Sequence, residues 1–271
     1  MKNGEKIVYP AHIAGIIFLA AAALLFFIQP LAAGIIAFLY ILLCFAASFF
    51  PATSFFGPVV SRGNTGENLV ALTFDDGPSD PLTRQILDLL DKYKAPATFF
   101  VTGANAVKYP EIIKEIICRG HDIGNHSFHH DPFLMLKSSR VIFEEIITAR
   151  EVLRKMGVET PAFRPPVGIV NPKLAPLLLE LKMYCITFSC RAFDAGNRRV
   201  KGIGRKILKK IACDDIVLLH DAMPPRQGDE TVLLREIEDL LCGLTSRGLK
   251  VTPLSRLIGR SVMNKGTKLK K

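Results

Sequence analysis

The sequence predicts an α/β protein whose main domain is a (β/α) barrel of about seven strands, preceded by a transmembrane hairpin of two helices. Two observations predict the domain. Short β-favouring runs alternate with segments of helical periodicity between residues 67 and 258, an order typical of parallel sheets and barrels. Polar residues follow several of these strands directly, at the end where such barrels gather their chemistry. Two charge-free segments ahead of the domain predict the hairpin.

The first 50 residues are predicted to be a membrane anchor. No Asp, Glu, Lys or Arg occurs from Ala11 to Phe50. Residues 11–28 and 31–50 each approach the ~20 apolar residues that a bilayer requires, and Gln29-Pro30 between them favours a helix break. A cleaved signal peptide is the alternative, but the apolar stretch continues for about twenty residues past any early cleavage site.

The hairpin returns the domain to the side of the membrane that holds Met1, and the flanking charges favour the cytoplasm for both ends. Lys2 and Lys6 precede the first apolar segment and Arg62 follows the second, as the positive-inside rule expects of cytoplasmic loops. The six cysteines include no Cys-x-x-Cys pair, which is consistent with reduced thiols in a cytosol-facing domain. We therefore predict an integral, two-pass cell-membrane protein.

The remaining elements follow in order. Residues 51–66 are rich in Pro, Ser, Gly and Asn and are interpreted as a linker. An apolar strand at 70–74 precedes the helix-start signal Ser79-Asp80-Pro81. Apolar periodicity predicts helices at 82–94, 110–119, 138–156, 173–182, 198–212 and 230–247. Short β-favouring runs predict further strands at 97–101, 121–124, 162–163, 184–188, 216–219 and 249–251.

The chain carries a formal net charge of +10, and half of it lies in residues 259–271, which hold five basic residues and no acidic one. This basic tail is predicted to be disordered or to rest on anionic lipid head groups, so membrane lipids are expected partners. No motif that combines basic and aromatic residues accompanies it, and we expect no nucleic-acid partner.

Asp75 and Asp76 directly follow the strand at 70–74, and Gly77-Pro78 then turns the chain. Successive side chains of a strand point in opposite directions. The two carboxylates can therefore take different roles, one holding a metal ion and one facing a water molecule. Alone, this pattern would equally fit a strand that ends in a polar turn.

His126 and His130 follow another predicted strand and lie four residues apart. In a helical turn or a tight loop this spacing directs both imidazoles to one point. With Asp76 they would supply three ligands and leave a position open, which is the pattern of a catalytic zinc site. Cobalt, manganese or nickel could fill the same ligand set.

Two further residues lie beyond strand ends. Arg164 precedes two prolines that fix a rigid turn, and its guanidinium could hold a carboxylate. A surface turn is the simpler interpretation of this motif by itself. His220 follows the apolar strand at 216–219, where an imidazole can donate a proton near neutral pH.

In the order and spacing of these motifs the chain resembles the polysaccharide deacetylases, also called NodB homology domains or carbohydrate esterase family 4. The resemblance covers residues 69–255, and its motifs are Thr-Phe-Asp-Asp-Gly-Pro at 73–78, His-Ser-x-x-His at 126–130, Arg-Pro-Pro at 164–166 and Leu-Leu-His-Asp at 218–221. It implies a distorted (β/α) barrel that hydrolyses N-acetyl groups of amino sugars.

The resemblance also implies a role for each residue. Asp75 is then the general base, Arg164 orients it and His220 is the general acid. The metal is held by Asp76, His126 and His130. Amide hydrolysis needs these functions, together with a donor for the developing oxyanion, which the backbone N–H of Val167 is expected to supply.

The chain departs from the family pattern in two places. Val167 stands where the family usually has an aromatic residue. The fourth motif usually carries Asp and Trp, whereas residues 188–194 read Phe-Ser-Cys-Arg-Ala-Phe-Asp and the chain contains no Trp. Asp194 is then the expected partner of His220, and Arg191 is expected to pair with a carboxylate of the site.

The leading hypothesis is a membrane-anchored, metal-dependent hydrolase that removes N-acetyl groups from an amino-sugar polysaccharide or oligosaccharide. A deacetylase or deformylase of a lipid-linked amino sugar is the second hypothesis, favoured by the anchor and the basic tail. A non-catalytic glycan-binding membrane protein is the third, and the intact set of acid, base and metal residues argues against it.

Overall fold

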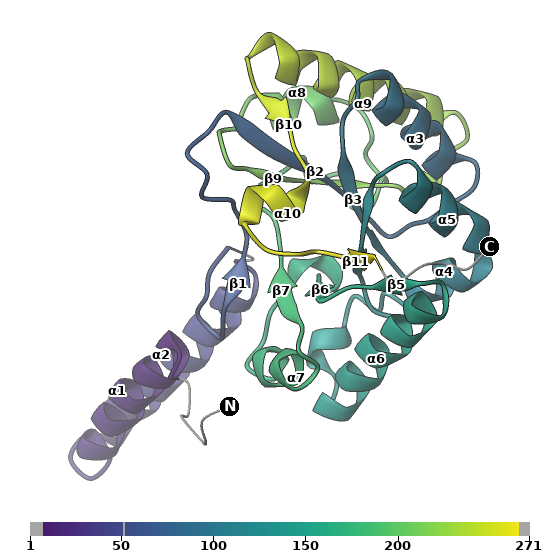
Figure 1. The fold of residues 1–271 in the computed structure, drawn as a ribbon. Helices are drawn as coiled ribbons and strands as arrows, with labels where there is room; N and C mark the ends of the chain where they lie inside the picture. Colours follow the sequence, from purple (N-terminus) through teal and green to yellow (C-terminus); the bar gives the residue numbers. More distant parts are fainter. Residues whose placement is uncertain (1–7, 51, 266–271) are drawn as a thin grey trace.

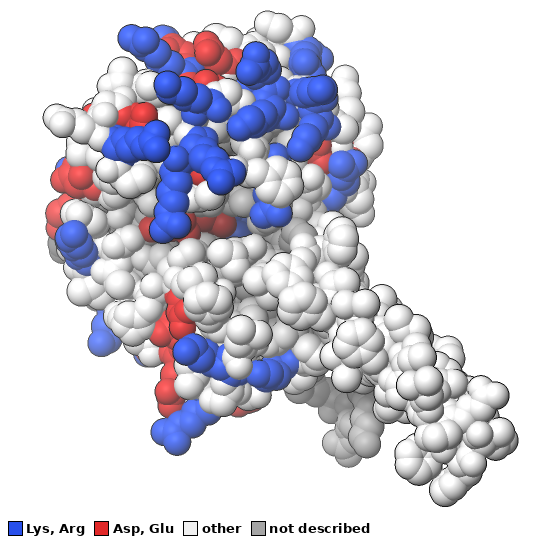
Figure 2. Space-filling view, turned by 180° about the vertical axis from the view of Figure 1, so that it is seen from behind, with Lys and Arg blue, Asp and Glu red and all other residues white. Residues whose placement is uncertain are grey.

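The computed structural model describes residues 8–50 and 52–265, which form a rod-like helical hairpin and a rounded α/β body (Figure 1). Helices α1 (Pro10–Leu25) and α2 (Pro30–Ser48) lie side by side, and each begins with a proline. The Tyr40 hydroxyl of α2 donates a hydrogen bond to the carbonyl of Ala11 (3.0 Å). The face of the hairpin shown in Figure 2 lacks the charged side chains that cover the body.

Within the described residues, α2 is the one helix long and apolar enough to cross a membrane, and α1, with 16 residues, is shorter. Most large apolar side chains of both helices are exposed, such as Leu24 and Leu31. The hairpin therefore does not bury its apolar surface against the body.

The body is built on a curled sheet of parallel strands (Figure 1). Its strand order is β1-β7-β6-β4-β3-β2-β9-β8, and β10 pairs with β2. The bounds are β1 (Val59–Val60), β2 (Leu69–Asp75), β3 (Ala97–Val101), β4 (Asp122–Asn125), β6 (Ala162–Phe163), β7 (Tyr184–Ile186), β8 (Cys190–Arg191), β9 (Ile216–His220) and β10 (Lys250–Val251). The edge strands β1 and β8 are not paired with each other, so the predicted barrel is an open half-barrel.

Helices surround the sheet, and a small antiparallel sheet of β5 (Val158–Glu159) and β11 (Asn264–Lys265) lies beside it. The helices of the body are α3 (Leu82–Lys92), α4 (Gly103–Lys108), α5 (Pro110–Cys118), α6 (Ser139–Lys155), α7 (Leu174–Glu180), α8 (Ile203–Leu208), α9 (Asp229–Ser246) and α10 (Leu254–Ile258). Two 3₁₀ turns span Leu134–Leu136 and Pro166–Gly168.

The two central strands are buried on both faces. Phe74 of β2 and Phe99 of β3 stack with ring centroids 5.1 Å apart and share a core with Ile86 and Leu90 of α3. Phe100, the next residue of β3, belongs to a second core on the other face of the sheet. Each such burial contributes ~1.5–3 kcal/mol. This double burial explains why both strands read as continuous apolar runs.

Three segments differ from the sequence expectation. Residues 51–66, interpreted as a linker, contribute β1, which pairs with β7. A two-residue strand is too short to show periodicity. The helix expected over 198–212 is restricted to α8, because Gly202 takes a left-handed conformation (φ 74°) at its start. The basic tail contributes β11, and residues 266–271 lie outside the described part of the chain.

Parallel strands bring their carboxyl ends to one rim of the half-barrel. β2 ends at Asp75 and β9 at His220, and these two residues are paired in register. β4 and β6 end one residue before His126 and Arg164, respectively. Residues distant in sequence therefore meet at this rim.

Candidate active site

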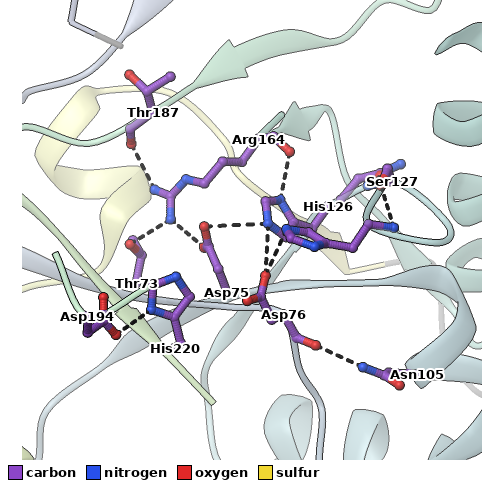
Figure 3. A network of polar contacts seen from close by, with 12 residues as sticks. Thr73, Asp75, Asp76, Asn105, His126, Ser127, Arg164, Thr187, Asp194 and His220 are labelled. Carbon is purple, nitrogen blue, oxygen red and sulfur yellow. Dashed lines mark hydrogen bonds and ion pairs between the residues drawn. The ribbon is translucent and has the colours of Figure 1, made fainter. Parts of the chain in front are cut away.

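Asp75 and Asp76 take different positions at the end of β2 (Figure 3). Asp75 belongs to the strand and is buried. Asp76 leaves it with a left-handed backbone (φ 75°), and the Asn105 side chain donates a hydrogen bond to its carbonyl (2.8 Å). The left-handed backbone at Asp76 thus explains why the two carboxylates take different positions, as was expected of them.

Asp76, His126 and His130 converge on one point. Asp76 Oδ1 lies 3.3 Å from His126 Nε2 and 3.0 Å from His130 Nε2. The three possible ligand atoms lie within 4.8 Å of one another. His126 Nδ1 donates to the carbonyl of Arg164 (2.8 Å), and this leaves Nε2 directed at Asp76 (Figure 3). A histidine ligand is commonly oriented in this way.

The chemistry of this cluster fits a divalent cation. Asp76 Oδ1 is buried, and no properly aligned hydrogen bond reaches it from the described residues although two imidazole nitrogens face it. Burial alone would raise the pKa of Asp76, but the imidazoles of His126 and His130 beside it hold that pKa well below its usual range. An ionised carboxylate with two imidazoles is a ligand set that zinc accepts.

Arg164 holds the second carboxylate. Its Nη1 donates to Asp75 Oδ1 (2.6 Å) and to Thr73 Oγ1 (2.8 Å), and Nη2 donates to the carbonyl of Thr187 (2.8 Å). The guanidinium is fully buried and lies 4.0 Å from the ring centroid of Phe100. Asp75 Oδ2 remains on the side of His126 Nε2, at 3.6 Å. The structure thus brings Arg164 to Asp75, which the Arg-Pro-Pro motif alone could not establish.

His220 and Asp194 form the third part of the site. His220 Nδ1 lies 2.7 Å from Asp194 Oδ2. Burial alone would lower the pKa of His220, but the hydrogen bond and charge of Asp194, with the charges of Asp76 and Asp75, raise it to about 9. A raised pKa favours the protonated form of this imidazole, which is the form that can act as an acid.

This raised pKa predicts a pH effect for the variant Asp194→Asn. His220 must carry its proton to act as an acid, so activity should fall as pH rises through the pKa of His220. Without the Asp194 charge, burial dominates and this pKa falls. The alkaline limb of kcat/KM should therefore move to lower pH in the variant, as a pH–rate profile can show. An unchanged limb would contradict the role of Asp194.

Two residues that fix this region received no role from the sequence, although Asp221 belongs to the motif at 218–221. Asn197 is buried and donates to the carbonyls of His220 (2.9 Å) and Ala222 (2.7 Å), which ties the Asp194 loop to β9. Asp221 is buried behind the aspartate pair and accepts a hydrogen bond from Thr83 (2.7 Å). Its burial, outweighing that bond and reinforced by the charges of Asp76 and Asp75, raises its pKa to about 7.

Gly77 explains how Asp221 fits there. A Cβ on Gly77 would lie 2.0 Å from Asp221 Oδ2, so the turn after the two aspartates can approach the buried carboxyl only without a side chain. The glycine of this motif is thereby a packing requirement as well as a turn signal.

Val167 lies at the edge of the site, in the turn Pro166–Gly168, and is half exposed. Its φ of 53° is in the left-handed region, which is unusual for a β-branched residue. Strain of this kind is often found at functional sites. Its role as an oxyanion donor stays a prediction.

Arg191 does not form the ion pair with a site carboxylate that was expected from the sequence. No carboxylate oxygen lies within 4.0 Å of its guanidinium among the residues that the structure describes. Instead its Cζ lies 5.1 Å from the ring centroid of Phe188 and 4.1 Å from that of Phe193. Asp194, three residues on, is already bonded to His220.

These groups line one cavity of about 680 Å³. The cavity is faced by the three predicted metal ligands and also by Asp75, His220 and Asp194. Val167 forms part of its wall. Arg164 is absent from the lining because it lies behind Asp75, fully buried. From there it contacts the site through its hydrogen bond to Asp75.

Comparison with known proteins agrees with these motifs. A family model described as polysaccharide deacetylase matches residues 62–186. The chain is 31% identical over 194 residues to a peptidoglycan-N-acetylglucosamine deacetylase of Bacillus cereus, covering 71% of this chain and 89% of that protein. The chain belongs to the polysaccharide deacetylase family. It is thus a hydrolase of the class that acts on carbon–nitrogen bonds, as its motifs predicted.

Two further matches support this family assignment. A chitooligosaccharide deacetylase of Bradyrhizobium is 31% identical over 204 residues, covering 71% of this polysaccharide deacetylase and 92% of the relative. The crystal structure of a peptidoglycan N-acetylglucosamine deacetylase superposes with a TM-score of 0.65 at 27% identity, covering 77% of this chain and 95% of that one.

Proposed function

We propose that this polysaccharide deacetylase is a membrane-anchored, metal-dependent enzyme that removes N-acetyl groups from amino sugars of a polysaccharide or oligosaccharide. The observation that carries the proposal is the convergence of Asp76, His126 and His130 in one cavity with the Asp75 carboxylate and with His220, which Asp194 holds. The names of the two relatives, which are deacetylases of peptidoglycan and of chitooligosaccharides, support the substrate class.

Asp76, His126 and His130 would hold the divalent ion, with zinc favoured by ligand type and cobalt, manganese or nickel as alternatives. When bound, the ion polarises the acyl carbonyl and lowers the pKa of water. Asp75, its other oxygen held by Arg164, accepts a proton from the attacking water. The Val167 N–H donates to the carbonyl oxygen as negative charge develops there. His220 then protonates the leaving amine.

Product analysis tests the reaction. The purified full-length protein, loaded with zinc, should release acetate from N-acetylglucosamine oligomers or from peptidoglycan fragments and leave free amines on the sugar. Formate should be measured in parallel on N-formyl sugars. If neither acid is released from any amino-sugar substrate while the metal is bound, the proposed activity is wrong.

A lipid-linked amino sugar is the second candidate substrate, and the apolar hairpin favours it. α2 meets the length and hydropathy of a membrane span, and only ten residues separate its end from β1 of the catalytic body. A short hairpin of this kind would keep the catalytic body close to the membrane. An extracted lipid-linked N-acetyl or N-formyl sugar should then be hydrolysed faster than a polymer of the same sugar.

We also propose that both apolar helices cross the membrane, so that the chain is a two-pass protein with both ends in the cytoplasm. Two antiparallel spans return the body to the side of Met1, and Lys2, Lys6 and Arg62 favour the cytoplasmic side. A fluorescent protein that matures only in the cytoplasm, fused after Lys271, should therefore fluoresce. A phosphatase active only after export should be silent at the same position, and the reverse pattern would place the cavity outside.

A further inference from the structure

Arg191 places a positive charge in the wall of the active-site cavity, and the charge of Asp194 acts on it only from beyond ion-pair distance. It lines the cavity and has no carboxylate partner within 4.0 Å in the described ranges 8–50 and 52–265. The rings of Phe188 and Phe193 flank its guanidinium. A planar guanidinium packed against aromatic rings is restricted in orientation, so less freedom is lost when it binds an anion.

Arg198 and Arg199 add two more positive charges to the same cavity. Both line it and both are exposed, and the described residues offer neither one an acidic partner. Their loop is anchored because Asn197 bonds the end of β9 and the Arg199 N–H donates to the carbonyl of Asp194 (3.0 Å). These hydrogen bonds therefore hold the backbone that carries Arg198 and Arg199 in place.

The carboxylates of the cavity do not neutralise these arginines. Asp75 is paired with Arg164, and Asp194 is paired with His220. Asp76 belongs to the cluster with His126 and His130. Each acidic group that faces the cavity thus has a partner of its own, and the charges of the three arginines remain available to a ligand.

We propose that Arg191, Arg198 and Arg199 form an anion subsite, and that the amino-sugar substrate carries an oxyanion, phosphoryl or carboxyl, near the ring whose acyl amide is hydrolysed. Guanidinium groups bind such oxyanions through paired, charge-assisted hydrogen bonds. The hydrolytic part of this inference rests on the proposed function, whereas the binding of the anion does not.

The surroundings of the subsite favour anions as well. Residues 198–210 contain seven Lys or Arg and no Asp or Glu. Figure 2 shows Lys and Arg side chains gathered over the part of the body that carries α8, away from the hairpin. A positive field of this kind draws anionic substrates toward a cavity. Its position away from the hairpin favours a substrate anion over the head groups of the membrane that would hold the hairpin.

Kinetics with three matched substrates test the subsite. They are neutral N-acetylchitotriose, the same trimer with a phosphate on its reducing end, and an oligosaccharide with the lactyl carboxylate of N-acetylmuramic acid. At least one anionic substrate should have the higher kcat/KM, and comparing the two identifies the oxyanion. Arg191→Gln, or Arg198→Gln with Arg199→Gln, should reduce the preference for the anion about 10- to 100-fold, mainly through KM. Because Arg198 and Arg199 are exposed, their double variant should fold and can test the subsite even if Arg191→Gln does not fold.

The control is Lys206→Gln, which removes one exposed charge of α8 that does not line the cavity. This variant should keep most of the preference in kcat/KM for the anionic over the neutral substrate. Equal kcat/KM for neutral and anionic substrates, or an equal loss in the control, would overturn the subsite.

A binding measurement separates this inference from the proposed function. Calorimetric titration of the metal-free protein with glucosamine 1-phosphate, which has no acyl group to hydrolyse, should show binding that Arg191→Gln weakens. Glucosamine itself should bind less tightly. If the two ligands bind equally, the subsite is absent whether or not the protein hydrolyses acetyl groups.

Discussion

His126→Ala and His130→Ala are each expected to lose the bound divalent metal and all measurable hydrolysis. Either change leaves two protein ligands, Asp76 and one imidazole, and two ligands hold a catalytic ion poorly. Metal content per chain, measured by elemental analysis after dialysis, and release of acetate should fall together. Excess zinc should restore little activity.

His129→Ala is the matched control for these variants. His129 lies in the same loop but is exposed, and its ring bonds Glu145 (2.6 Å) and not the cluster. Glu145 also accepts the backbone N–H groups of Phe128 and His129, which the variant retains. The control should keep its metal. Full occupancy in His126→Ala or His130→Ala would refute the ligand assignment.

Asp75→Asn is expected to keep the metal and to lose most turnover. A general base typically contributes ~10²–10⁴-fold to the rate, and an amide cannot accept the proton. The change also leaves the buried charge of Arg164 without its anion, so the free energy of unfolding should fall by ~3–5 kcal/mol. Activity must be measured where the variant is still folded, as circular dichroism can check. Loss of the metal instead would mean that Asp75 and Asp76 have exchanged roles.

The sequence could predict the central strands because each is buried on both faces. β2 and β3 form continuous apolar runs, and residues placed directly beyond a parallel strand must gather at one rim. Asp75, Asp76, His126 and His220 could therefore be assigned to one site before any distances were known. Their motif order also indicated the family, which the comparisons confirm.

Contacts distant in sequence could not be predicted in the same way. Asn197 has no motif of its own, and its role depends on the carbonyls at the end of β9 that its side chain reaches. Arg191 was expected to meet a carboxylate, but its neighbours on the folded chain are two phenyl rings. β1 forms because β7 offers it an edge, which two valines alone do not reveal.

Zinc titration of the metal-free protein, with acetate release from an N-acetylglucosamine oligomer as the readout, measures whether metal binding and deacetylation are coupled. We expect one ion per chain and activity that rises in proportion to occupancy, with neither effect in His126→Ala. Full activity in the thoroughly demetallated protein, or no acetate release at full occupancy on any amino-sugar substrate, would show that the protein is not a metal-dependent deacetylase.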